Sequence, residues 1–286
     1  MNKFEQKSIN QEPLYKLESL EDEGRFGNDV FLRLTFMRHA EKDALGKITK
    51  TGKEVARERG KSIVEDEEQF DAYKVYHSKP SPLNKKHAMR AEETAKALDE
   101  GIKNEGLPQT QFHRRPLREL LSDKILKTSD EFMQKLLRAE EEPGVETGDK
   151  EGASLSYYLD NFFDERPDRD TASMKEVGEE ILEIVEHFIE LSGHLKNRSK
   201  VNILLVSHSG MIEPMLKLLL KKQQAEKGSA QDISLRDLGG AIKFLEEVKF
   251  DILREDKENY TVTLSFRDKH INLGKLNLEH GEEEQK

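Results

Sequence analysis

The sequence predicts an α/β fold: a three-layer sandwich with a mostly parallel central sheet flanked by helices. Two observations predict it. Along the 286 residues, apolar runs of strand length alternate with amphipathic segments of helix length. The runs Val30–Met37 and Val201–Val206 are the most strand-like and largely apolar, as buried strands are. Ligands of such sheets bind beyond the carboxyl ends of the strands, so that edge is where we look for a site.

The first half of the chain alternates strand and helix. Thr49 has the side chain of a helix N-cap, and the helix after it is expected to run to about Glu67. Arg90–Ile102 is rich in Ala, Glu and Lys, which favour a helix. The apolar runs around these helices are expected to be strands: Val30–Met37, Tyr73–His77 and Phe112–Leu117.

The stretch from 120 to 174 is interpreted as an insertion that covers one end of the sheet. It has helical patches around Asp130–Glu140 and Ser154–Phe163, with a Pro143-Gly144 turn between them. This stretch has no recognisable motif.

The last part of the chain is expected to complete the sandwich. Lys175–Leu191 places its apolar residues on one stripe, which predicts an amphipathic helix. A second helix is expected at Met211–Lys222, after the strand Val201–Val206. Ala241–Leu253 and Tyr260–Asp268 alternate in polarity and are expected to form an antiparallel closing pair.

Composition limits the classes of partner and chemistry. The net charge of −10 argues against nucleic acid or an anionic membrane as the main partner. The absence of cysteine excludes disulfides, thiolate chemistry and Cys-ligated zinc. No apolar stretch approaches 18 residues, so a cytoplasmic location is expected.

The apolar pattern also suggests domain boundaries. Residues 1–28 lack apolar periodicity and are expected to be a flexible arm. Residues 29–278 are expected to form one domain, and residues 279–286 a disordered tail. The oligomeric state is left open.

Two of the expected strands end in histidine. His39 follows Val30–Met37 with Arg38 directly before it, and His208 follows Val201–Val206 after one serine. Since carboxyl ends of parallel strands share one edge of the sheet, we expect these side chains to lie together.

Five short motifs surround these histidines and resemble those of the histidine phosphatase superfamily, which has the phosphoglycerate-mutase-like fold. In chain order the motifs are Arg38-His39-Ala40; Ile48-Thr49-Lys50-Thr51-Gly52; Ser81-Pro82-Leu83 followed by Arg90-Ala91-Glu92-Glu93-Thr94-Ala95; Leu117-Arg118-Glu119; and Ser207-His208-Ser209-Gly210.

The resemblance implies roles for these residues in phosphomonoester hydrolysis. His39 would be the nucleophile and form a phosphohistidine, because a neutral imidazole can attack near neutral pH. Arg38 and Arg90 would bind phosphate oxygens with their planar guanidinium groups, and a protonated His208 would assist them. The resemblance implies no metal and no cofactor.

Glu119 is the candidate general acid, which would protonate the leaving alkoxide and later activate water. Asp123, Glu41 and Glu213 are alternatives. The acid is therefore left open among four carboxylates.

Departures from the family pattern favour its small-phosphatase branch. Lys42 stands where many relatives carry a Thr or Ser that touches phosphate. A loop at 84–89, with Lys85 and Lys86, precedes Arg90 and is expected either to lengthen the rim of the site or to be a solvated basic loop. The Asn and Gly-Trp pair of the mutases are missing, and His208-Ser209 replaces the His-Asp of acid phosphatases and phytases.

The favoured interpretation is a phosphatase acting on a small phosphorylated substrate or a phosphoprotein. A phosphoglycerate-type mutase, a phosphate-binding module without turnover, and a metalloenzyme using both histidines are the alternatives. The arginine beside His39 argues against the metalloenzyme, because a cation repels a metal ion.

Overall fold

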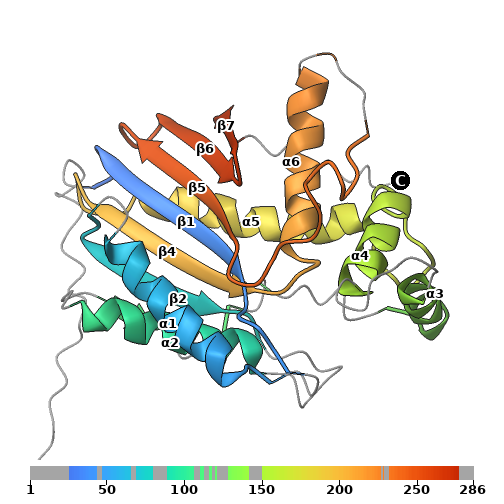
Figure 1. The fold of residues 1–286 in the computed structure, drawn as a ribbon. Coiled ribbons are helices and arrows are strands. Elements are labelled where there is room, and N and C mark those ends of the chain that lie inside the picture. Colours follow the sequence, from blue (N-terminus) through green and yellow to red (C-terminus); the bar gives the residue numbers. More distant parts are fainter. Residues whose placement is uncertain are drawn as a thin grey trace, which may run out of the picture.

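The computed structural model describes residues 26–43, 47–65, 69–79, 89–105, 110–112, 116–117, 120, 128–141, 150–226, 228 and 232–276. In these residues seven strands form a single sheet in the order β3-β2-β4-β1-β5-β6-β7 (Figure 1). The strands are β1 (Val30–Arg38), β2 (Ala72–His77), β3 (Thr110–Phe112), β4 (Lys200–Ser207), β5 (Glu247–Arg254), β6 (Tyr260–Phe266) and β7 (Lys269–Gly274). The helices are α1 (Lys50–Glu65), α2 (Arg90–Asn104), α3 (Asp130–Glu140), α4 (Lys150–Asn161), α5 (Met174–Ser192) and α6 (Ile212–Glu226).

The sheet is mixed, and its parallel half carries the strand ends of interest. β3, β2, β4 and β1 pair in parallel, whereas β1, β5, β6 and β7 pair in an antiparallel manner. The structure thus confirms the α/β class and the antiparallel pairing of β5 with β6.

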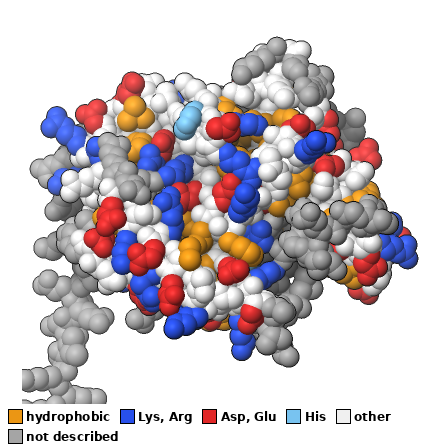
Figure 2. All heavy atoms as spheres, in the orientation of Figure 1, with side chains coloured by type: hydrophobic (Ala, Val, Ile, Leu, Met, Phe, Trp, Pro, Cys, Tyr) orange, Lys and Arg blue, Asp and Glu red, His pale blue; other side chains and the backbone are white. Residues whose placement is uncertain are grey.

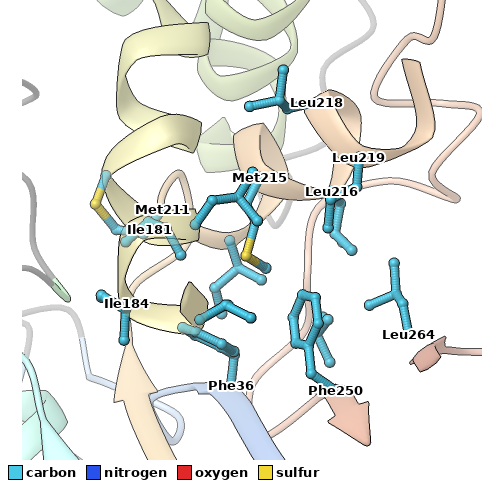
Figure 3. Close-up of a cluster of buried hydrophobic side chains, with 14 of the residues drawn as sticks. Phe36, Ile181, Ile184, Met211, Met215, Leu216, Leu218, Leu219, Phe250 and Leu264 are labelled. Atoms are coloured by element: carbon cyan, nitrogen blue, oxygen red, sulfur yellow. The ribbon is translucent and has the colours of Figure 1, made fainter. Parts of the chain in front are cut away.

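Helices cover both faces of the parallel half, which confirms the three layers. On one face, α1 and α2 approach each other so closely that a Cβ at Gly101 would lie 2.0 Å from the carbonyl oxygen of Arg57. On the other face, apolar side chains of α5 and α6 meet those of β1, β5 and β6 (Figure 3). Phe36 and Phe250 pack edge to face at the base of this cluster. The core thereby holds β1 between two helical layers.

The helices α3 and α4 lie beyond the carboxyl ends of the parallel strands, as Figure 1 shows. The expected helix Asp130–Glu140 is confirmed, and α4 begins earlier than the expected Ser154. Thr49 caps α1 as expected, since its Oγ1 accepts a hydrogen bond of 2.8 Å from the Gly52 N–H. The described part of the 120–174 insertion therefore covers the edge where a site is expected.

One expected strand is described only at its two ends. Of the run Phe112–Leu117, Phe112 is the last residue of β3 and Leu117 forms an isolated bridge with Ser78, while residues 113–115 lie outside the described residues. Pro116 lies within that run and has no N–H to contribute to a ladder.

Two further differences lie in the antiparallel half. The expected strand Ala241–Leu253 begins too early, because the chain turns before Glu247, with Leu245 at a φ of 59°. The edge strand β7 was not expected, since its polar and exposed residues have no apolar periodicity.

The first described residues do not stand apart from the sheet. Phe26 forms a bridge with Lys196, and the Gly27 N–H donates to the carbonyl of Leu195 over 2.9 Å. Residues 1–25 and 279–286 lie outside the described residues, so the arm, the tail and the domain limits stay predictions.

The described surface is strongly charged. On the face seen in Figure 2, basic and acidic side chains are interspersed and do not separate into large areas of one sign. Among the described residues, two bidentate ion pairs join Arg33 to Asp251 and Arg59 to Glu247. Within the described ranges, none of the helices combines the length and the apolar character needed to cross a membrane.

Candidate active site

The parallel register of β1 and β4 brings the two strand-end histidines together. Arg38 is opposite Ser207, and the His39 N–H donates to the Ser207 carbonyl over 3.0 Å. The ring centroids of His39 and His208 lie 5.2 Å apart. The expectation that these strand ends converge is confirmed.

His39 is held in one orientation by its own backbone. The ring is only 2% exposed, and its Nδ1 lies 2.8 Å from the Ala40 carbonyl oxygen. Because a carbonyl can only accept, Nδ1 carries the proton when the imidazole is neutral, and the lone pair resides on Nε2. This is the tautomer that a histidine nucleophile requires.

Arg38 is fixed beside His39 by two contacts. Its Nη1 donates to the Ile242 carbonyl over 2.8 Å, and its Cζ lies 4.3 Å from the centroid of the Phe244 ring. The residue is 7% exposed. A planar guanidinium stacked on an aromatic ring loses rotational freedom, so its remaining N–H groups point in fixed directions.

Arg90 enters the same site as the first residue of α2. Thr94, one turn later, couples this helix to the nucleophile: its Oγ1 donates to the Arg90 carbonyl over 2.8 Å and accepts from the Ala40 N–H over 3.0 Å. The longer loop before Arg90 has therefore not removed it from the site. Residues 84–88 of that loop lie outside the described residues.

A cavity of about 300 Å³ joins these groups. At one end, Arg38, His39, Arg90 and His208 line it together with Ser209 and Gly210. At the other end, the wall consists of residues from α3, α4 and their flanks. The structure thus gathers four of the five expected site residues around one hollow.

Burial and positive charge together keep His39 neutral. Removal of the ring from water lowers its pKa well below the usual value near 6.5, and the charges of His208 and Arg90 lower it further. The hydrogen bond to Ala40 raises the pKa, but its effect is smaller than that of burial.

Glu119 lies outside the described residues. Its neighbours do reach the site edge: the Leu117 N–H donates to the His77 carbonyl over 2.9 Å, and the Leu120 carbonyl accepts from Ser207 Oγ over 2.5 Å. Asp123 also lies outside the described residues.

The two other candidate acids do not line the cavity. Glu41 is exposed and accepts a long hydrogen bond from Thr49. Glu213 is fully buried, and its carboxylate accepts from Ser209 Oγ, the Gly210 N–H and the Ile242 N–H. Lys42 does not line the cavity either and pairs through its backbone with Ile48.

Ser78 was not expected from the sequence to organise the site, and Glu213 was considered only as an alternative acid. Ser78 follows β2 and its Oγ lies 3.0 Å from His208 Nε2, so it fixes the second histidine. A polar residue directly after a buried strand was the available signal. Glu213 connects the loop after His208 to Ile242, which in turn holds Arg38.

The arrangement of possible metal ligands bears on the metalloenzyme alternative. Within the described part of the chain, no three His, Asp or Glu side chains gather closely enough to hold a metal ion.

Comparison with known proteins gave structural similarities only. No family model matches the sequence, and no curated protein matches it. A mycobacterial glucosyl-3-phosphoglycerate phosphatase shares 16% identity over 82% of this chain and 97% of its own, with a TM-score of 0.44. Two further structures are similar. A putative phosphohistidine phosphatase from Agrobacterium tumefaciens shares 10% identity over 84% of this chain and 97% of its own, with a TM-score of 0.35. A phosphoglycerate mutase from Plasmodium falciparum shares 14% identity over 87% of this chain and 96% of its own, with a TM-score of 0.33.

These solved structures share at most 16% identity with the chain. Since their TM-scores lie below 0.5, the assignment of a function depends on the residues of this chain.

The Glu213 network gives a first prediction. In Glu213→Gln, one carbonyl oxygen remains where two carboxylate oxygens accepted three hydrogen bonds, and an NH₂ group faces a donor. We expect urea denaturation to show a loss of about 1–3 kcal/mol in unfolding free energy, the cost of unsatisfied buried polar groups. Glu226→Gln, an exposed change at the end of the same helix, is the control and should leave stability within about 0.5 kcal/mol. Equal stabilities of the two variants would contradict the network.

The lowered pKa of His39 gives a second prediction. Protonation of a buried ring is disfavoured only in the folded state, so the unfolded chain binds the extra proton first as the pH falls. The contribution of His39 to stability should be present above pH 6.5 and be lost progressively below it. NMR titration of the His39 ring should show a neutral imidazole below that pH, and the urea-unfolded chain should titrate near 6.5. A folded-state midpoint at or above 6.5 would show that the ring is not kept neutral.

Proposed function

We propose that this protein is a phosphoric monoester hydrolase of the histidine phosphatase type, with His39 as nucleophile. The observation that carries the proposal is the state of His39: buried, neutral, bonded through Nδ1 to Ala40, and surrounded by cations. A ring in that state has a nucleophilic Nε2 beside groups that attract a phosphate dianion.

The reaction proceeds in two displacements. His39 Nε2 attacks phosphorus, the P–O bond to the leaving group breaks, and its electron pair and an acid's proton form the alcohol. Water then attacks the phosphohistidine, the N–P bond breaks, and inorganic phosphate leaves. The ring returns to its starting tautomer because Ala40 holds the Nδ1 proton throughout.

Arg38, Arg90 and His208 bind the phosphate in this proposal. Charge builds up on the equatorial oxygens during transfer, and donors fixed before the reaction stabilise that charge without rearranging. The stacking of Arg38 on Phe244 and the contact of His208 with Ser78 supply this fixation. His208 in its protonated form would serve as the third cationic donor.

Glu119 remains the proposed general acid. The positions of Leu117 and Leu120 at the ends of β2 and β4 support it, and the engagement of Glu213 by three donors speaks against that alternative.

The substrate in this proposal is a small phosphorylated compound or a phosphoprotein, and the protein acts without metal or cofactor in the cytoplasm.

Replacement of the nucleophile tests the proposal directly. With a labelled phosphomonoester and EDTA present, rapid quench should trap phosphate on the protein that is acid-labile and base-stable. His39→Ala should lose the adduct and all but a few per cent of the turnover, whereas His194→Ala, an exposed histidine outside the site, should keep both. Turnover that depends on added Zn²⁺ or Mg²⁺ would favour a metalloenzyme, and an adduct that passes to a second alcohol in preference to water would favour a mutase.

Arg90→Lys tests whether Arg90 binds the phosphate. Lysine keeps the positive charge but lacks the planar guanidinium group that can donate two parallel hydrogen bonds. The value of kcat/KM should therefore fall by about 10²–10³, the effect of one lost oxyanion donor. Arg57→Lys, on the exposed face of α1, is the matched control and should retain wild-type kinetics. Wild-type kinetics in Arg90→Lys would mean that another cation binds the phosphate.

A further inference from the structure

The cavity is chemically divided. Its phosphate end has the two arginines and two histidines, but its far wall is built mainly from apolar side chains. The wall residues are Met133 and Leu136 of α3, Leu155 and Tyr158 of α4, Met174 at the start of α5, and the small hydroxyls of Thr128 and Ser154. Among the described residues that line the cavity, the cationic side chains all lie at the phosphate end.

Among the described residues of the wall, Tyr158 is the titratable one, and its ring faces the cavity as an uncharged group. The Tyr158 hydroxyl donates to the Ala172 carbonyl over 2.5 Å, and the residue is 3% exposed. Burial and the charges of Asp168 and Glu176 raise the pKa of Tyr158, so the phenol stays protonated. It therefore neither attracts a cation nor donates a proton to a substrate.

The wall is stiffened by aromatic packing behind it. Phe132 is fully buried and packs edge to face against Tyr158, with ring centroids 4.7 Å apart, and against Phe162 at 5.1 Å. α3 begins at a side-chain cap, since Ser129 Oγ accepts from the Phe132 N–H. Such pairs and caps keep α3 and α4 at a fixed separation.

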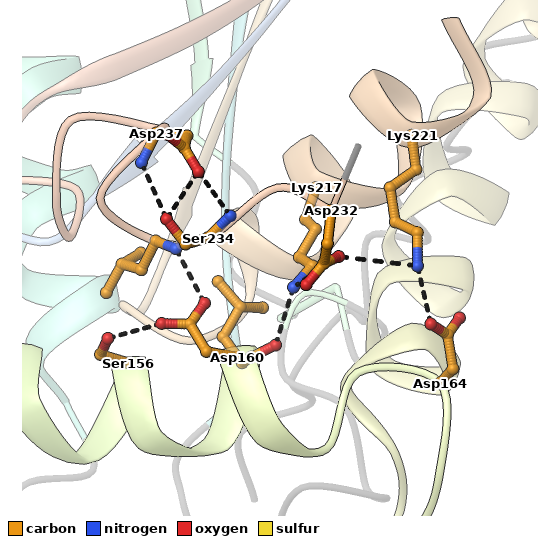
Figure 4. Close-up of polar contacts among 10 residues, drawn as sticks. Ser156, Asp160, Asp164, Lys217, Lys221, Asp232, Ser234 and Asp237 are labelled. Carbon is orange, nitrogen blue, oxygen red and sulfur yellow. Dashed lines mark hydrogen bonds and ion pairs between the residues drawn. The ribbon is translucent and has the colours of Figure 1, made fainter. Parts of the chain in front are cut away.

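Polar contacts anchor the same wall to the domain (Figure 4). The buried Lys217 donates to the Leu159 carbonyl in the last turn of α4, where the helix dipole favours a cation. Asp160 accepts from the Leu235 N–H, and Lys221 pairs with Asp164 over 2.7 Å. The apolar wall is thus a preformed surface opposite the phosphate end.

The dimensions suit one ring. A cavity of about 150 Å³ accommodates benzene, so a total of about 300 Å³ leaves comparable room for a phosphate. A substrate with a second anionic group would place that charge against hydrocarbon without a partner, which is costly. A polyhydroxylated group would lose hydrogen bonds with water along the same wall.

We propose that the site selects phosphomonoesters whose leaving group is apolar and about the size of an aromatic ring. The inference rests on the proposed phosphatase function and specifies its substrate class. The ring lies between Leu136, Leu155 and Tyr158, while its phosphate contacts Arg38, Arg90 and His39. A free aromatic phosphate and a phosphotyrosyl side chain share this chemistry.

The test compares leaving groups of similar chemistry. Benzyl phosphate and glycerol 3-phosphate both release a primary alkoxide, so the ratio of their kcat/KM values reports the wall and not the ease of departure. The wild-type protein should prefer benzyl phosphate by about 10- to 100-fold, the effect expected from burying one ring. A ratio near one, or a preference for glycerol 3-phosphate or 3-phosphoglycerate, would overturn the substrate class while leaving the phosphatase function intact. Free phosphotyrosine and a phosphotyrosine peptide then distinguish the two sources.

Lysine substitutions at two adjacent positions of α3 test whether the wall causes the preference for benzyl phosphate. Leu136→Lys brings a cation to the half-buried wall and should lower the ratio by about tenfold, with a gain for 3-phosphoglycerate. Leu137→Lys, on the 43% exposed side of the same helix, should leave the ratio unchanged. Equal ratios in the two variants would show that the wall does not cause the preference for benzyl phosphate.

If no phosphomonoester is hydrolysed, the phosphatase proposal fails. Calorimetric binding measurements then test separately whether the wall selects an apolar group. In His39→Ala, benzyl phosphate should bind at least tenfold more tightly than glycerol 3-phosphate, and equal affinities would overturn the inference.

Discussion

The site depends on the parallel register between β1 and β4. Because Arg38 is opposite Ser207, β1 and β4 end side by side at the same edge of the sheet. Just beyond the end of β1, the His39 N–H still donates to the Ser207 carbonyl. A shift by one residue would turn every side chain of β1 to the other face. The buried side chains of Leu34 and Phe36 on one face and Met37 on the other make such a shift costly. Core packing therefore fixes the register that sets the distance between the histidines.

A second constraint is that the described residues lining the cavity include two arginines and two histidines but no carboxylate. The protein meets it by binding the positive groups through backbone carbonyls and aromatic faces: Arg38 bonds to Ile242 and stacks on Phe244. The buried carboxylate of Glu213 accepts from Ser209 Oγ and from the Gly210 and Ile242 N–H groups, and it does not line the cavity. In the proposed function, a phosphate dianion would supply negative charge beside the arginines, while the same cations keep the pKa of His39 low.

The sequence predicts the residues at strand ends better than the contacts between distant segments. Arg38, His39 and His208 follow long apolar runs, so periodicity alone indicates the edge at which they lie. The contacts of Ser78 with His208 and of Glu213 with Ile242 join segments far apart in the chain, and nothing local to either residue predicts those partners.

The wall of α3 and α4 shows why the insertion was the least legible part of the sequence. Its helices α3 and α4 have 11 and 12 residues against 19 in α5, so each offers a shorter apolar pattern, and their aromatic residues pack together around Phe132. In the proposed function, the residues that attack the phosphate come from the ends of β1 and β4, whereas the residues that would contact the leaving group come mainly from α3 and α4.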